Sequence, residues 1–210
     1  MIKNYIKSAF RSLAKNKGFT VINILGLALG LATCLLIVFY VVDELSYDRF
    51  NENANRIYRV NADLKLGDNE QQYAGTMPPL AKTLINEYPD VENAVRLKKA
   101  EINIKKGNEN IIENDVIFAD PAVFDVFTLP LLDGDRSSAL KSPNTVVISK
   151  SAAIKYFNKV DVIGQKLDLP NYAILTITGV MEDMPKQSHF YADFIMSMAS
   201  YKDSGSNHWL

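Results

Sequence analysis

The chain has 210 residues, a single cysteine and an almost balanced charge, with 23 basic and 24 acidic residues. One cysteine excludes an internal disulfide bond, so a folded domain in this chain must be held together by its core alone. Every acidic residue follows position 42, and the net negative charge of that part argues against nucleic acid as a partner.

The first eighteen residues predict an amphipathic basic helix. Apolar side chains from Ile2 to Leu13 recur on one arc of such a helix, and Lys3, Lys7, Arg11 and Lys15 fall on another. This pattern suits a helix that lies along the inner leaflet, with its lysines and the following Lys17 among anionic lipid headgroups. The alternative is a simple topology signal with chance periodicity. We expect a bend at residues 16–18, because Gly18 tolerates the backbone angles of a corner.

Residues 19–42 form an uninterrupted run without a charged side chain, which predicts a membrane-spanning helix. The run is longer than the roughly 20 residues that a span needs. Lysine and arginine close to a spanning helix are retained in the cytoplasm, and five of them precede this run with no acidic residue among them. The N-terminus is therefore expected in the cytoplasm and residues 43–210 outside it.

Two other interpretations of the apolar run are a cleaved signal peptide and a lipoprotein signal. A cleaved signal peptide has an apolar stretch of only about 7 to 15 residues, which is shorter than this run. Leu31 to Cys34 loosely resemble the lipid-attachment motif of lipoproteins. Thr33 fits that motif poorly, and the apolar residues continue to Val42, so a membrane-buried Cys34 is favoured.

Gly26 and Gly30 form a GxxxG motif within the run, with Ala28 and Ala32 nearby. Small residues spaced by four allow another helix to approach closely in lipid. The motif alone is weak evidence, because glycine is common in spanning helices, but it suggests a helix that packs against others.

The exported part predicts one domain of the α+β class. Apolar residues alternate with polar ones from Tyr58 to Lys65, as in a half-buried strand. A turn at 67–69 then leads to a second strand at 71–76, and Pro78 and Pro79 precede a helix with an apolar face from Leu80 to Tyr88. Further strands are expected at 94–104, 110–118, 145–148, 165–169, 174–181 and 194–198, with a hairpin turn at 106–108 and a helix capped by Ser149.

The sequence gives no physical reason to assign an enzymatic activity. It lacks a phosphate-binding GxxxxGK[ST] loop, a GxSxG elbow and a zinc-binding HExxH motif. Its two histidines are too few for a zinc site, and carboxylate pairs such as Asp43 with Glu44 are most simply solvated. We therefore expect no catalytic residue, no metal and no cofactor in this chain.

Several stretches resemble the N-terminal segment of MacB/FtsX-type ABC transporter permeases. They are KNYIKSAFRSLAKNKGFTVINILGLALGLATCLLI, DELSYDRFNENANRIYRV, ADPAVFDVFTLPLLDGD, SPNTVVISKSAAIKYF and GVMEDMPKQSHFYADFIMS. They occur in the order of the family and cover most of residues 3–198, and the stretch from Tyr47 to Val60 is the most specific. The resemblance implies a cytoplasmic helix at 1–18, a spanning helix at 19–42 and a MacB-like periplasmic core domain from residue 43.

The resemblance also implies partners and a mechanism. Such permeases carry no nucleotide site, so ATP and Mg²⁺ would bind a partner ATPase in the cytoplasm. The other expected partners are membrane lipid, further permease helices, a second half of the permease or a second copy of the chain, and possibly a periplasmic adaptor. In the MacB branch, ATP-driven closure is thought to move periplasmic domains through the spanning helices, which is called mechanotransmission. The implied function is export or efflux, of antimicrobial peptides, macrolides or lipoproteins, at the bacterial inner membrane.

One departure is that no second apolar run follows the domain, so the sequence predicts an N-terminal fragment that is incomplete after residue 210. Asp43, Glu44, Tyr47, Asp48 and Phe50 join the spanning helix to the domain, and we expect a stiff junction there with Tyr47 and Phe50 packed into the domain. Two alternatives stay open: a membrane-anchored periplasmic binding or sensor module without transport activity, and a membrane-tethered hydrolase.

Overall fold

The computed structural model describes residues 2–66, 69–170 and 172–201. The chain divides into two units, residues 1–47 and 48–210. The first unit consists of helices α1 (Ile2–Lys15) and α2 (Lys17–Glu44). By length and composition α2 can cross a membrane, because its mean hydropathy reaches 2.6 and none of its apolar window is buried.

The bend that was predicted at residues 16–18 lies at Asn16. This residue has φ −106° and ψ 56°, outside the helical range, and Lys17 and Gly18 already belong to α2. The predicted role of Gly18 is therefore wrong. Thr20 Oγ1 instead donates a hydrogen bond of 2.9 Å to the carbonyl of Leu13, which ties the start of α2 to the last turn of α1.

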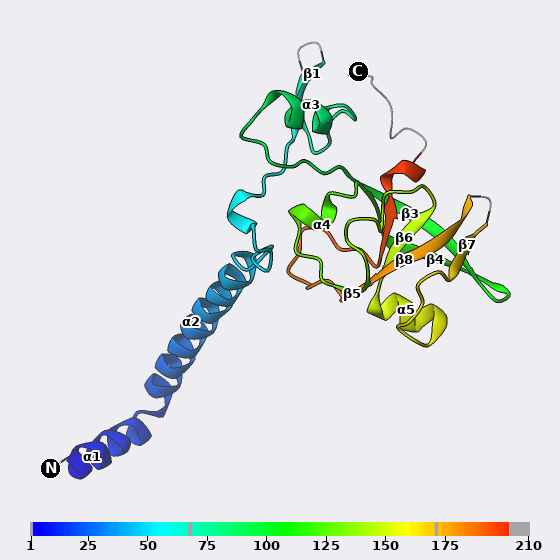
Figure 1. Cartoon of the computed structure of the whole chain (residues 1–210). Coiled ribbons are helices and arrows are strands. Elements are labelled where there is room, and N and C mark those ends of the chain that lie inside the picture. The colour runs from blue at the N-terminus through cyan, green and yellow to red at the C-terminus, as the bar shows by residue number, and fades with distance from the viewer. Residues whose placement is uncertain (1, 67–68, 171, 202–210) are drawn as a thin grey trace. The chain divides into compact units, whose positions relative to one another are not determined.

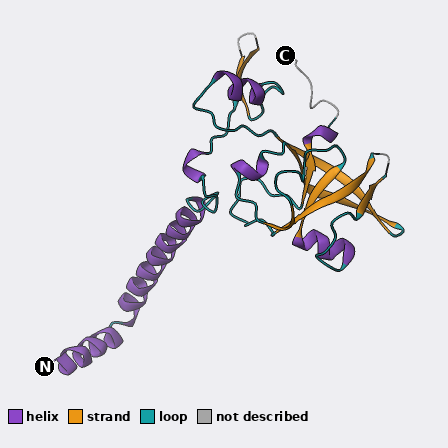
Figure 2. Cartoon of the chain, viewed as in Figure 1, coloured by secondary structure: helices purple, strands orange, loops and turns teal. Residues whose placement is uncertain are grey.

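The second unit contains a curved mixed sheet in the order β3-β4-β9-β6-β8-β5, with β7 paired to β8 beside this path. Edge strand β3 also lies close to β7, so the sheet curls toward closure. The described strands all belong to this unit (Figure 2). The strands of this sheet are β3 (Leu97–Lys106), β4 (Glu109–Ala119), β5 (Leu131–Gly134), β6 (Thr145–Ser149), β7 (Lys166–Leu169), β8 (Ala173–Met181) and β9 (Phe194–Ser197).

The two central strands, β9 and β6, are buried on both faces. On β9, Phe194 and Met196 join one apolar cluster, whereas Ile195 joins the other. Strands covered on both faces have nearly continuous apolar sequences, and this explains TVVIS in β6 and FIMS in β9. Strand β9 lies between β4, to which it is parallel, and β6, to which it is antiparallel.

Helices cover the two faces of the sheet. The first cluster includes Ala152 and Ala153 of α5 (Lys150–Phe157), which contacts β6 and β8 (Figure 1). The second includes Val123 and Phe124 of the short α4 (Val123–Val126). Ser149 caps α5, because its hydroxyl accepts a hydrogen bond from the backbone N–H of Ala152, as its position before the helix predicted. The α+β fold class is confirmed.

The segment between α2 and the large sheet, residues 54–87, differs from the prediction. The first strand, β1, runs over Ala62–Leu66 rather than from Tyr58, and pairs with β2 (Asn69–Tyr73). Helix α3 (Leu80–Glu87) follows the two prolines as expected, and a short 3₁₀ helix (Ala54–Arg56) comes earlier. The half-buried pattern predicted here is wrong: Tyr58 is 82% exposed, and no residue of these four elements whose exposure is described is buried.

Most other elements lie within a few residues of their predicted positions. The hairpin between β3 and β4 turns at Gly107, which has φ +62°. The turn predicted at 67–69 lies largely outside the described residues. Helix α4, strand β5 and the 3₁₀ helix Met198–Ser200 were not predicted. Each has only three or four residues, too few to show a periodicity in the sequence.

Candidate functional site

The residues that follow α2 are the most informative part of the chain for function. Asp43 and Glu44 lie in the exposed last turn of α2, and Ser46 closes it by donating its N–H and its hydroxyl to the carbonyl of Asp43. Tyr47 is half-buried. Only this residue separates Ser46 in the first unit from Asp48, the first residue of the second.

Asp48 is bonded to a segment that is distant in sequence. Its backbone N–H donates to the carbonyl of Gln187 at 2.9 Å. Its carboxylate accepts a hydrogen bond from the backbone N–H of His189 at 3.1 Å, and its Oδ2 lies 2.6 Å from His189 Nδ1. Asp48 has φ +57°, a left-handed conformation that aspartate tolerates better than most side chains.

Asn51 extends these contacts to a third segment. It is only 4% exposed although it is polar, and both ends of its amide are used. Nδ2 donates to the carbonyl of Asp48 at 3.1 Å, and Oδ1 accepts from the backbone N–H of Thr128 at 2.9 Å. Thr128 Oγ1 accepts in turn from the N–H of Glu52. We call Asp48, Asn51, Thr128, Gln187 and His189 the junction clamp.

The clamp adjoins the packed core of the sheet. Phe127 and Phe190, each next to a clamp residue, meet edge to face with ring centroids 4.8 Å apart, and both pack against the second apolar cluster. Phe50 is half-buried, and the predicted packing of Tyr47 and Phe50 into the domain stays a prediction.

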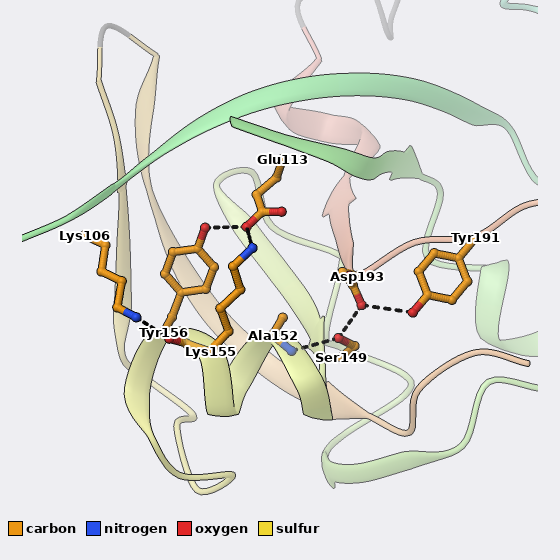
Figure 3. Close-up of polar contacts among 8 residues, drawn as sticks. All are labelled: Lys106, Glu113, Ser149, Ala152, Lys155, Tyr156, Tyr191 and Asp193. Carbon is orange, nitrogen blue, oxygen red and sulfur yellow. Dashed lines mark hydrogen bonds and ion pairs between the residues drawn. The ribbon is translucent and has the colours of Figure 1, made fainter. Parts of the chain in front are cut away.

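The segment that runs from the clamp to β9 is fixed at its far end by Asp193. Its backbone N–H donates to Asp115 at the start of the buried part of β4, and its carbonyl accepts from Ser149 at the end of β6. The Ser149 hydroxyl donates to Asp193 Oδ1 at 2.6 Å, and Tyr191 reaches the same oxygen at 3.4 Å (Figure 3). Asp193 thus connects both neighbours of β9 where that strand begins.

A second polar cluster joins α5 to the hairpin of β3 and β4. Glu113 accepts hydrogen bonds from Lys155 Nζ, at 2.6 Å, and from the Tyr156 hydroxyl, and Lys106 donates to the carbonyl of Lys155 (Figure 3). Burial and the bond to the Glu113 carboxylate both disfavour the tyrosinate, and they raise the pKa of Tyr156 above its ordinary value. These contacts hold α5 against the sheet.

The buried Ser149 is not arranged as a catalytic nucleophile. The hydroxyl of the fully buried Ser149 caps α5 and bonds Asp193, so it has no free path to a substrate. In the described part of the chain, no three residues among histidine, cysteine, aspartate and glutamate lie close enough to hold a metal ion.

The residues predicted to contact the membrane lie on the first unit. Lys3, Lys7, Arg11 and Lys15 are exposed on α1, and Lys17 starts α2. Gly26 and Gly30 line a shallow groove on α2 with Leu29, Thr33, Cys34, Ile37 and Val38. A Cβ atom at either glycine would meet nothing within 4 Å, so this face of the helix is open. Their roles in lipid binding and helix packing stay predictions.

Of the five predicted junction residues, the structure brings only Asp48 into the clamp. Its partners Asn51, Thr128 and His189 were missed, because polar residues far apart in sequence carry no periodic signal. One hint was available: His189 lies in the stretch GVMEDMPKQSHFYADFIMS, and Asp48 in DELSYDRF, two of the stretches that carry the family resemblance.

Comparisons with known proteins agree with this architecture. Residues 20–209 match the MacB-like periplasmic core domain family. The chain is similar to a solved domain assigned to a permease protein from Porphyromonas gingivalis, with 28% identity and a TM-score of 0.59; the match covers 66% of this chain and 65% of that one. The chain thus spans slightly less than two thirds of that structure.

Two further solved structures are more distant. The periplasmic region of MacB from Actinobacillus actinomycetemcomitans has 18% identity and a TM-score of 0.49, covering 63% of this chain and 60% of that one. The extracellular domain of the noncanonic ABC-type transporter YknZ from Gram-positive bacteria has 19% identity and a TM-score of 0.41, covering 54% and 58%. No curated protein matches the chain. The match over residues 20–209 shows that this chain belongs to the MacB-like periplasmic core domain family.

Proposed function

We propose that the chain is a permease component of an ABC transporter, in which movement driven by ATP hydrolysis on a partner ATPase passes through α2 to the periplasmic sheet domain. The observation that carries this proposal is the direct succession of the two parts. An apolar helix able to span a membrane leads, with three residues between, into a unit of the MacB-like periplasmic core domain family.

The proposal places the N-terminus in the cytoplasm, where a partner ATPase would bind ATP and Mg²⁺. The remaining permease helices would pack against the groove at Gly26 and Gly30, and a second copy of the chain or a second permease half would complete the assembly. The cargo classes proposed are antimicrobial peptides, macrolides and lipoproteins, and a periplasmic adaptor is a candidate partner of the sheet domain.

Co-purification from membranes tests this function directly. The chain would be expressed with the ATPases of its host and purified in detergent or nanodiscs. We expect an ABC ATPase to co-purify and its ATP hydrolysis to respond to the chain, and cells in which further permease helices complete the pair to resist or export one cargo class. An ATPase without its phosphate-binding lysine is the control, since it should assemble without supporting export.

The same experiment separates the alternative function. A membrane-anchored sensor would co-purify with no ATPase and would leave export unchanged when the gene is deleted. That result would contradict the proposed function.

A further inference from the structure

The junction clamp joins two stretches of sequence, DELSYDRF at the end of the spanning helix and KQSHFYADF at the start of β9, whose contacting residues are 141 positions apart. We infer that the clamp is the coupling joint of the protein: movement of α2 enters the sheet domain at β9 through Asp48 and His189. Asp48, Asn51 and His189 are thereby assigned as positioning residues for transmission. This inference rests on the proposed function.

The position of β9 explains why this route is effective. A force on residues 187–193 reaches a strand that is hydrogen-bonded to β4 on one side and β6 on the other. Asp193 bonds both neighbours at the point where β9 begins. Close-packed interiors transmit strain, so a displacement here moves the whole sheet rather than one edge.

The next segment along the chain is a poor alternative route. Residues 57–94 contain β1, β2 and α3, and none of these elements has a buried residue among those whose exposure is described. An isolated two-stranded hairpin is only marginally stable in water. A load that followed the chain into this segment would deform the hairpin first, whereas the clamp diverts it to the sheet before the hairpin is reached.

The hydrogen bonds of the clamp also restrict rotation of Asp48 relative to its partners. Asp48 is bonded through its backbone N–H, its carbonyl and both carboxylate oxygens, to Gln187, Asn51 and His189. A left-handed conformation in a residue other than glycine persists when its surroundings determine it. Because only Tyr47 separates the clamp from the cap of α2, little flexible chain is left in which movement could be lost.

Distance measurements on the 210-residue chain in nanodiscs test the joint. Spin labels replace Val42, exposed on α2, and Lys141, exposed in the sheet domain, in a Cys34→Ala background. We expect Asp48→Ala to broaden the distance distribution of the parent chain and Asp48→Asn to preserve it, because asparagine keeps a hydrogen-bonding side chain and tolerates the left-handed conformation.

The matched control is Arg56→Ala. It removes an ion pair with Glu92 that lies outside the clamp and is largely exposed, so the distribution should match that of the parent chain. His189→Ala serves if Asp48→Ala does not fold, since it removes a ring whose side chain is 68% exposed and should also broaden the distribution. A distribution as narrow in Asp48→Ala and His189→Ala as in the parent would overturn the inference.

A second measurement follows transmission in the chain assembled with its ATPase. A dye on Lys141→Cys reports movement when ATP is added, and ATP hydrolysis is measured in parallel. In Asp48→Ala we expect the dye response to fall about tenfold and hydrolysis to change less than about twofold, with Asp48→Asn restoring the response. An unchanged response, or an equal fall in both quantities, contradicts the inference.

The two measurements also separate this inference from the proposed function. If no ATPase assembles with the chain, the proposed function fails, and the spin-label widths still decide whether the clamp joins α2 to the sheet. If the ATPase assembles and the Asp48 variants change neither width nor response, the function stands and the inference fails.

Discussion

At the scale of single residues, the buried side chain of Asn51 stabilises the domain through its hydrogen bonds. Replacing Asn51 by alanine removes the acceptor of the half-buried Thr128 backbone N–H, and a hydrogen bond of this kind contributes roughly 0.5 to 1.5 kcal/mol to stability. We expect Asn51→Ala to lower the free energy of unfolding by about that amount, measured by urea titration with far-UV circular dichroism in detergent micelles.

Asn53→Ala is the matched control for this change. Asn53 is exposed, and its side chain does not cap the short 3₁₀ helix that follows it. The two variants should therefore differ clearly. Equal unfolding curves for Asn51→Ala and Asn53→Ala would show that the amide of Asn51 does not stabilise the domain.

Tyr156 makes the stability of the domain sensitive to alkaline pH. Burial and the hydrogen bond to Glu113 raise the pKa of Tyr156, so above the ordinary tyrosine pKa of about 10 the unfolded chain ionises first. The contribution of this group is complete below pH ~10 and is lost as pH rises through the pKa of the folded state. Stability should fall over this range.

Tyr156→Phe should remove part of the decrease in the free energy of unfolding at alkaline pH. Tyr172 and Tyr191 also have raised pKa values, chiefly through burial, so they contribute in the same direction and a residual decrease is expected. The measurement is urea unfolding at a series of alkaline pH values, together with tyrosinate absorbance of the folded chain. An identical alkaline decrease in both proteins would contradict the assignment to Tyr156.

At the scale of elements, the edge strand β5 depends on Gly134. This residue has φ +103°, and a Cβ atom on it would lie 2.6 Å from the Thr178 carbonyl oxygen and 2.8 Å from the Cα of Gly179 on β8. Neither backbone atom can move without breaking the ladder between β5 and β8. We expect Gly134→Ala to cost several kcal/mol, on the order of 3, and to raise amide exchange in β5.

Gly164→Ala isolates the steric part of this effect. Gly164 also has a positive φ, +79°, but nothing lies within 4 Å of the position that its Cβ would take. Gly164→Ala should lower the free energy of unfolding only by the cost of placing alanine in this backbone conformation. If both glycine variants lose the same stability, the close approach of β5 to β8 is not what requires glycine at position 134.

Much of the element pattern could be predicted, since the signals that form it are local. The apolar runs of β6 and β9, the cap at Ser149 and the turn at Gly107 follow from side-chain burial and backbone preference within a few residues. Strand order is different. The parallel pairing of Val116 with Phe194 joins segments far apart in sequence, and no local preference specifies it.

The same argument explains why the clamp was not predicted. Asp48 belonged to the predicted junction, but its partners are backbone groups and polar side chains that any loop could carry. The alternation from Tyr58 to Leu64 gave a wrong prediction, because a local pattern was present without a tertiary partner. It is the pattern of a half-buried strand, but the described part of the chain provides no surface to cover it.

At the scale of the whole molecule, the charges beside α2 predict its orientation. Lys3, Lys7, Arg11, Lys15 and Lys17 precede the apolar part of the helix, and Asp43 and Glu44 close it. Since nearby lysine and arginine are retained in the cytoplasm, a cysteine at Lys141 in a Cys34→Ala background should react with a membrane-impermeant thiol reagent in intact spheroplasts. A cysteine at Lys7 should react only after the membrane is opened.

Charge reversal then tests the cause of this orientation. Glutamate at the five basic positions should invert a substantial fraction of the chains, so that Lys141→Cys loses much of its external labelling. Lysine at Asp43 and Glu44 should invert fewer, because their reversal adds only two positive charges on the far side while the five original ones remain. External labelling that survives reversal of all five basic residues would show that the folding of the exported domain, rather than the basic helix, determines which side of the membrane it occupies.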